Sequence, residues 1–373
     1  MVEAPQDPSS LRPADDIQRI LISTTSRFTG VYESDGVRLD HAWMPLRGAY
    51  HVWDEGPTSR STYVLSFRTP PSPEPKAGVV IPDWSPTGDF IAALLSVLFG
   101  KRIEAHGSLE NCGSFGMPDV SAFSTTCLPG VPHNTHKPRA DVPLPLTLGE
   151  VRRMEDLWNI EHHDDAATFF FTACRFYQRA LVAADRDPEI AYLHLITAGE
   201  ILSQAWLPKS DERLLDDDLE AAMSQVTIAL NDRGKLARTL RNRLFEVKRR
   251  FVATFEALVD APFFERGEAE DLHSRLSRDK FAATMGAAYA VRSLNVHSGQ
   301  SIGAWMRPFA GLNEVQIGRP VVRNPELANA LADAPTLIGL ERVTRYALLR
   351  YAQMRLGVDL DIPAEEPAAV GES

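Results

Sequence analysis

Residues 279–299 read DKFAATMGAAYAVRSLNVHSG. Within this stretch Phe281, Met285, Tyr289 and Arg292 follow one another at intervals of four, four and three residues. Side chains at that spacing line one face of an α-helix, and the glycine that closes the stretch is typical of the end of a helix. We therefore predict a helix that buries its Phe281, Met285 and Tyr289 side. Arg292 should lie near the line of that buried side, an unusual place for a free charge.

The same helix carries a histidine five residues after the arginine, at position 297. On a regular helix His297 and Arg292 would be out of phase. A last turn that tightens or unwinds before Gly299 would let both side chains face one cleft. Alternatively, the arginine is buried and the histidine caps the helix, and both only hold the fold.

The string VRSLNVHSG resembles the hallmark of the HEPN superfamily of ribonucleases, an arginine followed after four to six residues by a histidine near the end of a core helix. Arg292, Ser293 and His297 match it, although many members have Asn where this chain has Ser293. The resemblance covers roughly residues 160–357 and includes the helices AYLHLITAGEILSQAW and ERVTRYALLRYAQMRL. The chain looks closest to the Apea-like HEPN subgroup with an additional N-terminal domain, a layout associated by analogy with phage defence.

This resemblance implies a metal-independent endoribonuclease, acting as a toxin-like or antiviral effector without a cofactor. RNA is cleaved without metal when its own 2'-OH attacks the adjacent phosphorus. An imidazole such as His297 can move the protons, and a guanidinium such as Arg292 can hold the phosphoryl oxygens. The resemblance also implies products with a 2',3'-cyclic phosphate and a 5'-OH, and a homodimer in which two motifs line one cleft. The alternatives are a non-catalytic HEPN module that binds RNA, a nucleotide or a partner protein, and a metal-dependent hydrolase.

Three further residues are candidates for supporting the pair. Glu200 follows Leu193 by seven residues and Ile196 by four, so it lies on or beside the apolar face of its helix. Its carboxylate would orient His297 or pair with Arg292, unless it is an ordinary, partly exposed glutamate. The other two candidates are polar residues of the motif itself, Ser293 and Asn295.

The segment 233–250 is the most basic part of an acidic protein. It supplies the candidates for contact with the RNA backbone, which are Arg238, Arg241, Lys248 and Arg249. The alternative is a solvated helix face whose positive charge balances the negative charge of the acidic run 211–220. Two histidine clusters, at 133–136 and 162–165, lack cysteine partners and the H-E-x-x-H layout, so we predict no metal site.

Length and composition define the class of protein. A chain of 373 residues favours two domains, and no window approaches the roughly 18 apolar residues of a membrane helix. The formal net charge of -11 argues against a protein that coats nucleic acid non-specifically, without excluding a local basic groove. Three cysteines without a C-x-x-C pair, and an N-terminus without a secretory signal, predict a soluble cytoplasmic protein with no membrane contact.

We predict an α+β protein, in which a mixed β-rich N-terminal domain precedes an all-α HEPN-type helical bundle. The expected parts are a disordered arm at 1–17, a mixed α/β domain with a sensing or regulatory role at 18–146, the helical domain at 147–360 and a disordered tail at 361–373. Strand-like runs lie at 20–22, 30–32, 63–67 and 79–81, and a helix is expected at 87–98. In the second domain, apolar spacing predicts helices at 147–160, 165–184, 188–206, 215–229, 234–259, 269–276, 278–297 and 340–356.

Overall fold

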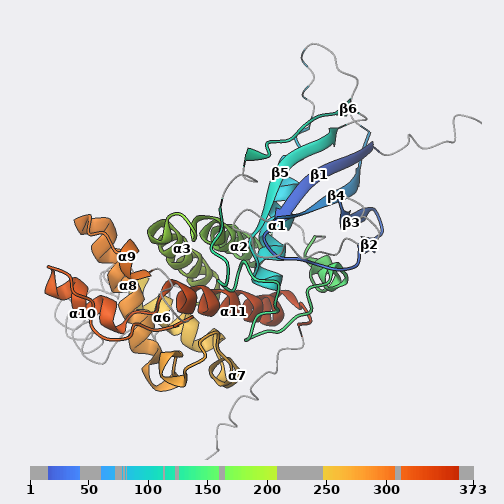
Figure 1. The fold of residues 1–373 in the computed structure, drawn as a ribbon. Coiled ribbons are helices and arrows are strands. Elements are labelled where there is room, and N and C mark those ends of the chain that lie inside the picture. The colour runs from blue at the N-terminus through green and yellow to red at the C-terminus, as the bar shows by residue number, and fades with distance from the viewer. Residues whose placement is uncertain are drawn as a thin grey trace, which may run out of the picture. The chain divides into compact units, whose positions relative to one another are not determined.

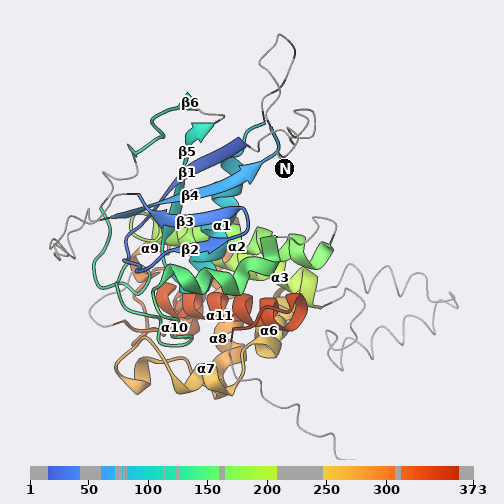
Figure 2. The same cartoon turned by 90° about the vertical axis from the view of Figure 1, so that its right-hand side faces the viewer.

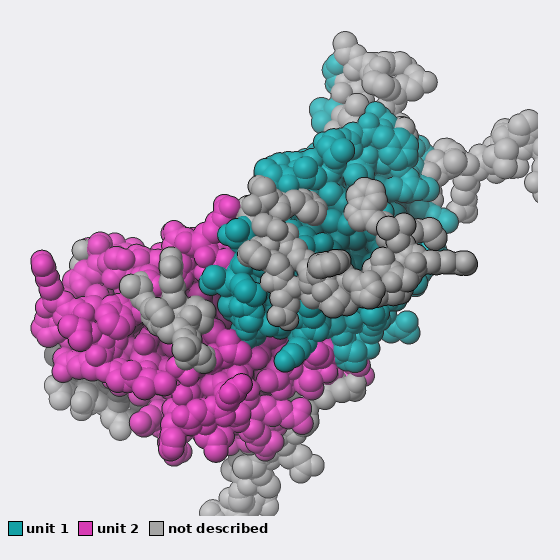
Figure 3. Space-filling model, viewed as in Figure 1, with its two compact units in different colours: residues 1–95, 101–137, 145–152 teal, residues 96–100, 138–144, 153–373 magenta. Residues whose placement is uncertain are grey.

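The computed structural model describes residues 16–42, 60–71, 78, 80, 82–111, 114–121, 126–158, 164–207, 247–306 and 312–360. The chain divides into two compact units (Figure 3). The first consists of residues 1–95, 101–137 and 145–152, and the second of residues 96–100, 138–144 and 153–373. Residues 138–144 therefore belong to the helical unit, although they precede most of it in the sequence.

The first unit contains an antiparallel sheet with the strand order β2-β3-β4-β1-β5-β6 (Figure 1). Its strands are β1 (Asp16–Thr24), β2 (Tyr32–Ser34), β3 (Val37–His41), β4 (Ser61–Thr69), β5 (Ile103–Asn111) and β6 (Ser114–Phe115). The long central strand β1 pairs with β4 on one side and with β5 on the other. This sheet, followed by a mostly helical C-terminal part, confirms the α+β class.

Helix α1 (Ser85–Phe99) confirms the helix expected at 87–98. It lies close to β1, because a Cβ atom on Gly88 would stand 2.7 Å from Cγ2 of Ile20. The glycine permits this close approach of helix and strand, and any larger residue there would have to displace Ile20.

The second unit is helical. Its helices are α2 (Asp165–Ala183), α3 (Pro188–Trp206), α6 (Val247–Leu258), α7 (Ala261–Glu265), α8 (Phe281–Ser298), α9 (Gly303–Met306), α10 (Pro325–Asp333) and α11 (Leu337–Leu356). Helix α11 runs through the middle of this unit, with α2 and α3 on one side and α6 on the other (Figures 1 and 2). Consistent with that position, every residue of α11 from position 337 to position 352 is buried.

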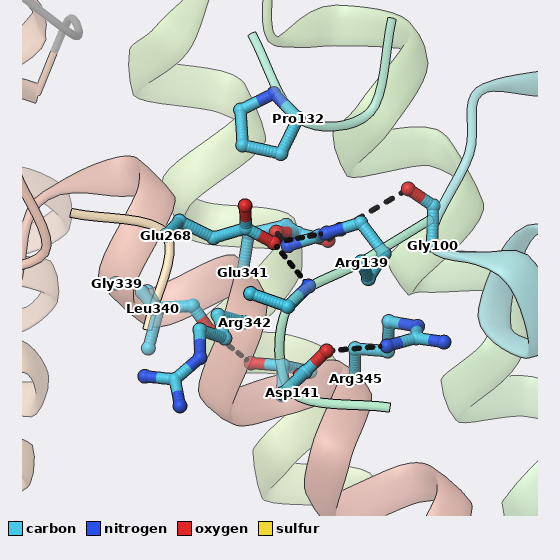
Figure 4. Close-up of polar contacts among 12 residues, drawn as sticks. Gly100, Pro132, Arg139, Asp141, Glu268, Gly339, Leu340, Glu341, Arg342 and Arg345 are labelled. Atoms are coloured by element: carbon cyan, nitrogen blue, oxygen red, sulfur yellow. Dashed lines mark hydrogen bonds and ion pairs between the residues drawn. The ribbon is translucent and has the colours of Figure 1, made fainter. Parts of the chain in front are cut away.

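Burying α11 on all sides also buries its charges. Arg345 pairs with Asp141 at 2.7 Å, and neither side chain has exposed surface. One turn earlier, Glu341 receives two hydrogen bonds from Arg139 at 2.7 and 2.6 Å (Figure 4). The pattern ERVTRYALLRYAQMRL did not predict this burial, because arginine and glutamate usually face solvent.

Several predicted elements differ from the structure in their type or bounds. The helix expected at 147–160 is a 3-10 helix, Leu148–Trp158, and that expected at 269–276 is reduced to the short 3-10 turn Leu272–Ser274. Strand β1 begins at Asp16, inside the predicted disordered arm, and the run at 30–32 becomes a strand only at Tyr32. The helix expected at 215–229 lies outside the described residues. None of the described helices has the length and apolar content needed to cross a bilayer.

Candidate active site

Helix α8 carries the arginine and the histidine of the motif. Its buried face consists of Phe281, Thr284, Met285, Ala288 and Val291. Tyr289, which the spacing assigned to this face, is only half-buried, so the buried line is displaced by one residue from the predicted one. This displacement places Arg292 at the edge of the buried face and not on it.

Arg292 is held from two sides. Its Nη2 atom donates to Oε2 of Glu200 on α3 over 3.3 Å, and its guanidinium carbon lies 5.7 Å from the centre of the Tyr289 ring. The Arg292 side chain keeps 26% of its surface exposed and that of Glu200 keeps 16%. Burial, followed by the charge of Glu200 and a hydrogen bond to it, raises the pKa of Tyr289. Two roles were considered for Glu200, orienting His297 and pairing with Arg292. In the structure Glu200 pairs with Arg292.

His297 lies on the last turn of the same helix and is exposed. The helix stays regular as far as Ser298 and ends at Gly299, which has a φ of 64° and donates its N–H to the carbonyl of Asn295 over 3.0 Å. The last turn neither tightens nor unwinds. On a regular helix, residues five apart point about 140° away from each other and are separated by about 7.5 Å along the axis. Arg292 and His297 of one chain therefore leave the helix in different directions.

Of the two motif residues proposed as supports, Ser293 is half-buried and Asn295 is firmly bonded. The Nδ2 group of Asn295 donates to Oε1 of Glu189 on α3 and to the carbonyl of Gln300. Sequence reasoning missed Glu189. The available signal was its place in the first turn of α3, directly after Pro188, but an acidic residue there normally serves the positive end of the helix dipole.

An open groove of about 670 Å³ lies between α6 and α8. Its α8 wall is made of small residues, and its α6 wall carries two of the predicted RNA-binding residues, Lys248 and Arg249, together with Glu256. The groove ends at Ala290, and Arg292 is not among the residues that line it. The other two candidates, Arg238 and Arg241, lie outside the described residues. The neighbouring Arg250 is buried, so it is not part of a solvated basic face.

The remaining histidines have other surroundings. His194 packs against the ring of Phe176 with 5.6 Å between the ring centres, and burial lowers its pKa. His133 is buried in the turn after the sheet, and His162 and His163 of the cluster at 162–165 lie outside the described residues. Over the ranges that the structure describes, no group of three or more potential ligands is arranged to hold a metal ion.

A second polar cluster lies on the sheet of the first unit. Oγ of Ser23 is 2.6 Å from Nε2 of His106, and burial lowers the pKa of that imidazole. A serine paired with a neutral histidine is the arrangement of an activated nucleophile. Ser23 has no exposed surface, however, so a substrate cannot reach its hydroxyl. The pair is better explained as a hydrogen bond that satisfies a buried hydroxyl and a half-buried imidazole.

The geometry at the end of α8 combines a partly exposed cation, held in place by a carboxylate and a ring, with a freely accessible imidazole. A groove with two further cations on its wall runs along another face of α8 and ends at Ala290. The arginine of this arrangement can bind a phosphate and the imidazole can move a proton, although one copy directs the two side chains away from each other. No family model, curated protein or solved structure matches this chain.

Proposed function

We propose that this chain is a metal-independent endoribonuclease of the HEPN type, acting as a toxin-like or anti-phage effector. The observation that carries the proposal is the arrangement at the end of α8, where a half-buried arginine is held by Glu200 and Tyr289 and an exposed histidine follows five residues later. An arginine held in this way keeps further N–H groups for a ligand, because a guanidinium has five donors.

In the proposed reaction the 2'-oxygen of the RNA forms a bond to the adjacent phosphorus while the bond from phosphorus to the 5'-oxygen breaks. The proton of the 2'-OH goes to a base, and a proton from an acid goes to the leaving 5'-oxygen, so the products are a 2',3'-cyclic phosphate and a 5'-OH. His297 acts as base or acid, and Arg292 stabilises the charge on the phosphoryl oxygens.

A homodimer belongs to this proposal for a geometric reason. His297 and Arg292 of one helix point about 140° apart, so one copy does not present both side chains to the same phosphate from a single face of the helix. We propose, as the resemblance implies, that two copies pair about a two-fold axis so that the His297 of one copy lies near the Arg292 of the other. They would also supply two imidazoles, one as base and one as acid.

The expected products provide the first test. Purified protein incubated with single-stranded RNA in EDTA should release fragments with 2',3'-cyclic phosphate and 5'-OH ends, which mass spectrometry identifies. Cleavage that needs an added divalent ion, or fragments with 5'-phosphate ends, would instead support a metal-dependent hydrolase.

The groove between α6 and α8 is proposed as the track of the RNA next to the cleaved bond. Replacing Lys248 and Arg249 together by glutamine should weaken binding of single-stranded RNA and lower the slope of log K against log salt by about 1.4, since each phosphate contact on a single strand contributes about 0.7. Fluorescence anisotropy across a salt series measures both quantities. The matched control replaces two exposed arginines elsewhere in the helical unit, Arg175 and Arg323, by glutamine. Equal effects of the two double changes would show that net charge, and not the groove, matters.

The second candidate function is a non-catalytic HEPN module that binds RNA, a nucleotide or a partner protein. The observation in its favour is the pairing of Arg292 with Glu200 on a helix that remains regular, because a neutralised arginine that points away from His297 is also what a structural motif would look like. RNA binding without any cleavage, unchanged when His297 becomes alanine, would favour this alternative.

A further inference from the structure

The carboxylate of Glu189 collects hydrogen bonds from the end of α8 and from the turn that follows it. Its Oε1 atom accepts from Nδ2 of Asn295. Its Oε2 atom accepts from Oγ of Ser301 at 2.9 Å and from the backbone N–H groups of Ile302 at 3.2 Å and Gly303 at 3.1 Å. One side chain at the start of α3 thus fixes the chain on both sides of the α8 terminus.

These bonds also favour the charged form of the carboxylate. Partial burial acts to raise the pKa of Glu189, but the hydrogen bonds from Asn295, Ser301 and the two backbone N–H groups outweigh it and hold the pKa below its ordinary value. Near neutral pH the group is therefore an anion with strong, charge-assisted hydrogen bonds.

Asn295 links this anion to the turn that carries the histidine. Both N–H bonds of its amide are used, one for Glu189 and one for the carbonyl of Gln300 at 2.8 Å. Its own backbone carbonyl accepts from Gly299 at 3.0 Å. Hydrogen bonds therefore join Asn295 to both Gly299 and Gln300, and His297 lies between these residues in the sequence.

His297 itself is exposed, and no side chain among the described residues is hydrogen-bonded to its ring. Catalytic histidines are commonly oriented by a hydrogen bond to their second ring nitrogen. Here the position of the imidazole depends on the backbone of the turn from Asn295 to Gln300. Glu189 and Asn295 hold this turn, and we call the two side chains the clamp. The orientation of His297 is thus only as well defined as this clamp.

We propose that Glu189 is a positioning residue for His297 and acts through Asn295. The carboxylate holds the last turn of α8 against the start of α3, and so it places the imidazole relative to the bound phosphate. Its contribution to RNA cleavage rests on the proposed function, whereas its effect on the position of His297 does not.

A double-mutant cycle on RNA cleavage tests the catalytic consequence. Glu189→Ala and Asn295→Ala are each expected to lower kcat by about 10- to 100-fold with little change in KM, because a displacement of about 1 Å at a catalytic group costs up to about 100-fold. Since both side chains act through one clamp, the double variant should lose no more than the worse single variant. Losses that multiply, or single variants that keep the wild-type kcat, would contradict the proposal.

Two variants test whether a lower kcat reflects the loss of this contact or a general loss of structure. Glu189→Gln keeps the shape of the side chain but lacks one acceptor and the charge, so its kcat should lie between those of wild type and Glu189→Ala. Asp271→Asn is the matched control, because this aspartate also accepts from the backbone, at the N–H of His273 over 3.0 Å, and lies on another turn of the helical unit. It should keep the wild-type kcat.

A measurement without RNA separates this proposal from the proposed function. The imidazole Cε1–H signal of His297, followed by NMR, should move in Glu189→Ala and Asn295→Ala but not in Asp271→Asn. The amides of Gly299, Ile302 and Gly303 should exchange with solvent at least tenfold faster in Glu189→Ala. If the wild-type protein cleaves no RNA, the proposed function fails, and the His297 signal still decides the role of Glu189. A signal that stays at its wild-type position would overturn that role.

Discussion

His297→Ala is expected to reduce RNA cleavage by about 10²- to 10⁴-fold, the contribution of a general acid or base, while RNA binding remains close to wild type. Arg292→Ala should lower kcat by about 10²- to 10³-fold, as removal of one group that stabilises the transition state does. A labelled RNA assayed in EDTA measures both. Undiminished cleavage by either variant would exclude the proposed mechanism.

Two further variants sharpen this experiment. Arg292→Lys keeps the positive charge but not the planar fork that, in the proposed mechanism, holds Glu200 and a phosphate together, so it should recover only a small part of the activity. His273→Ala removes another exposed histidine of the helical unit and should leave cleavage unchanged. If expression of the wild-type chain is toxic to cells, His297→Ala should abolish that toxicity, as the effector role requires.

Arg345→Met is expected to lower the free energy of unfolding by about 3–5 kcal/mol, because it leaves a buried carboxylate without its cation. Arg345 pairs with Asp141 at 2.7 Å and also donates to the backbone carbonyls of Val97 at 2.9 Å and Leu98 at 2.6 Å. Urea unfolding of the variant beside wild type measures the loss. Arg323→Met, at an exposed site, should change stability by no more than about 0.5 kcal/mol. A similar small change for Arg345→Met would mean that the pair contributes nothing.

The pair of Arg345 and Asp141 also makes the free energy of unfolding depend on pH. Burial acts to raise the pKa of Asp141, but the charge of Arg345, helped by Arg139 and Arg342, holds that pKa below its ordinary value. A carboxylate whose pKa is lower in the folded than in the unfolded state stabilises the fold above its unfolded pKa of about 3.9 and loses that effect as the pH falls through the folded value. Unfolding free energy should therefore decline in acid, and less steeply in Asp141→Asn.

The helices that the sequence predicted well are those with local signals. Pro188 at the first position of α3 and the apolar spacing that follows predicted the bounds of that helix without error. For α8, the same spacing and the glycine at 299 predicted a helix at 278–297, and the structure has it at Phe281–Ser298. The pairing of Glu200 with Arg292 was one of two roles considered, because the spacing placed the carboxylate near the apolar face without naming its partner.

The segments Leu148–Trp158 and Leu272–Ser274 had helical spacing but form 3-10 helices and not α-helices. Apolar residues three apart fit a 3-10 helix nearly as well as an α-helix, so the spacing does not separate the two. Tertiary packing decided these segments.

The sequence by itself determined that this protein joins a strand-rich part to a helical part, and that Arg292 and His297 lie near the end of one helix. Only the tertiary structure decided what surrounds them. Glu189 and Asn295 are 106 positions apart, and Arg345 and Asp141 are 204 apart. Spacing along one helix reports which side chains share a face of that helix. It carries no information about which distant segment meets that face, because this depends on how whole helices pack.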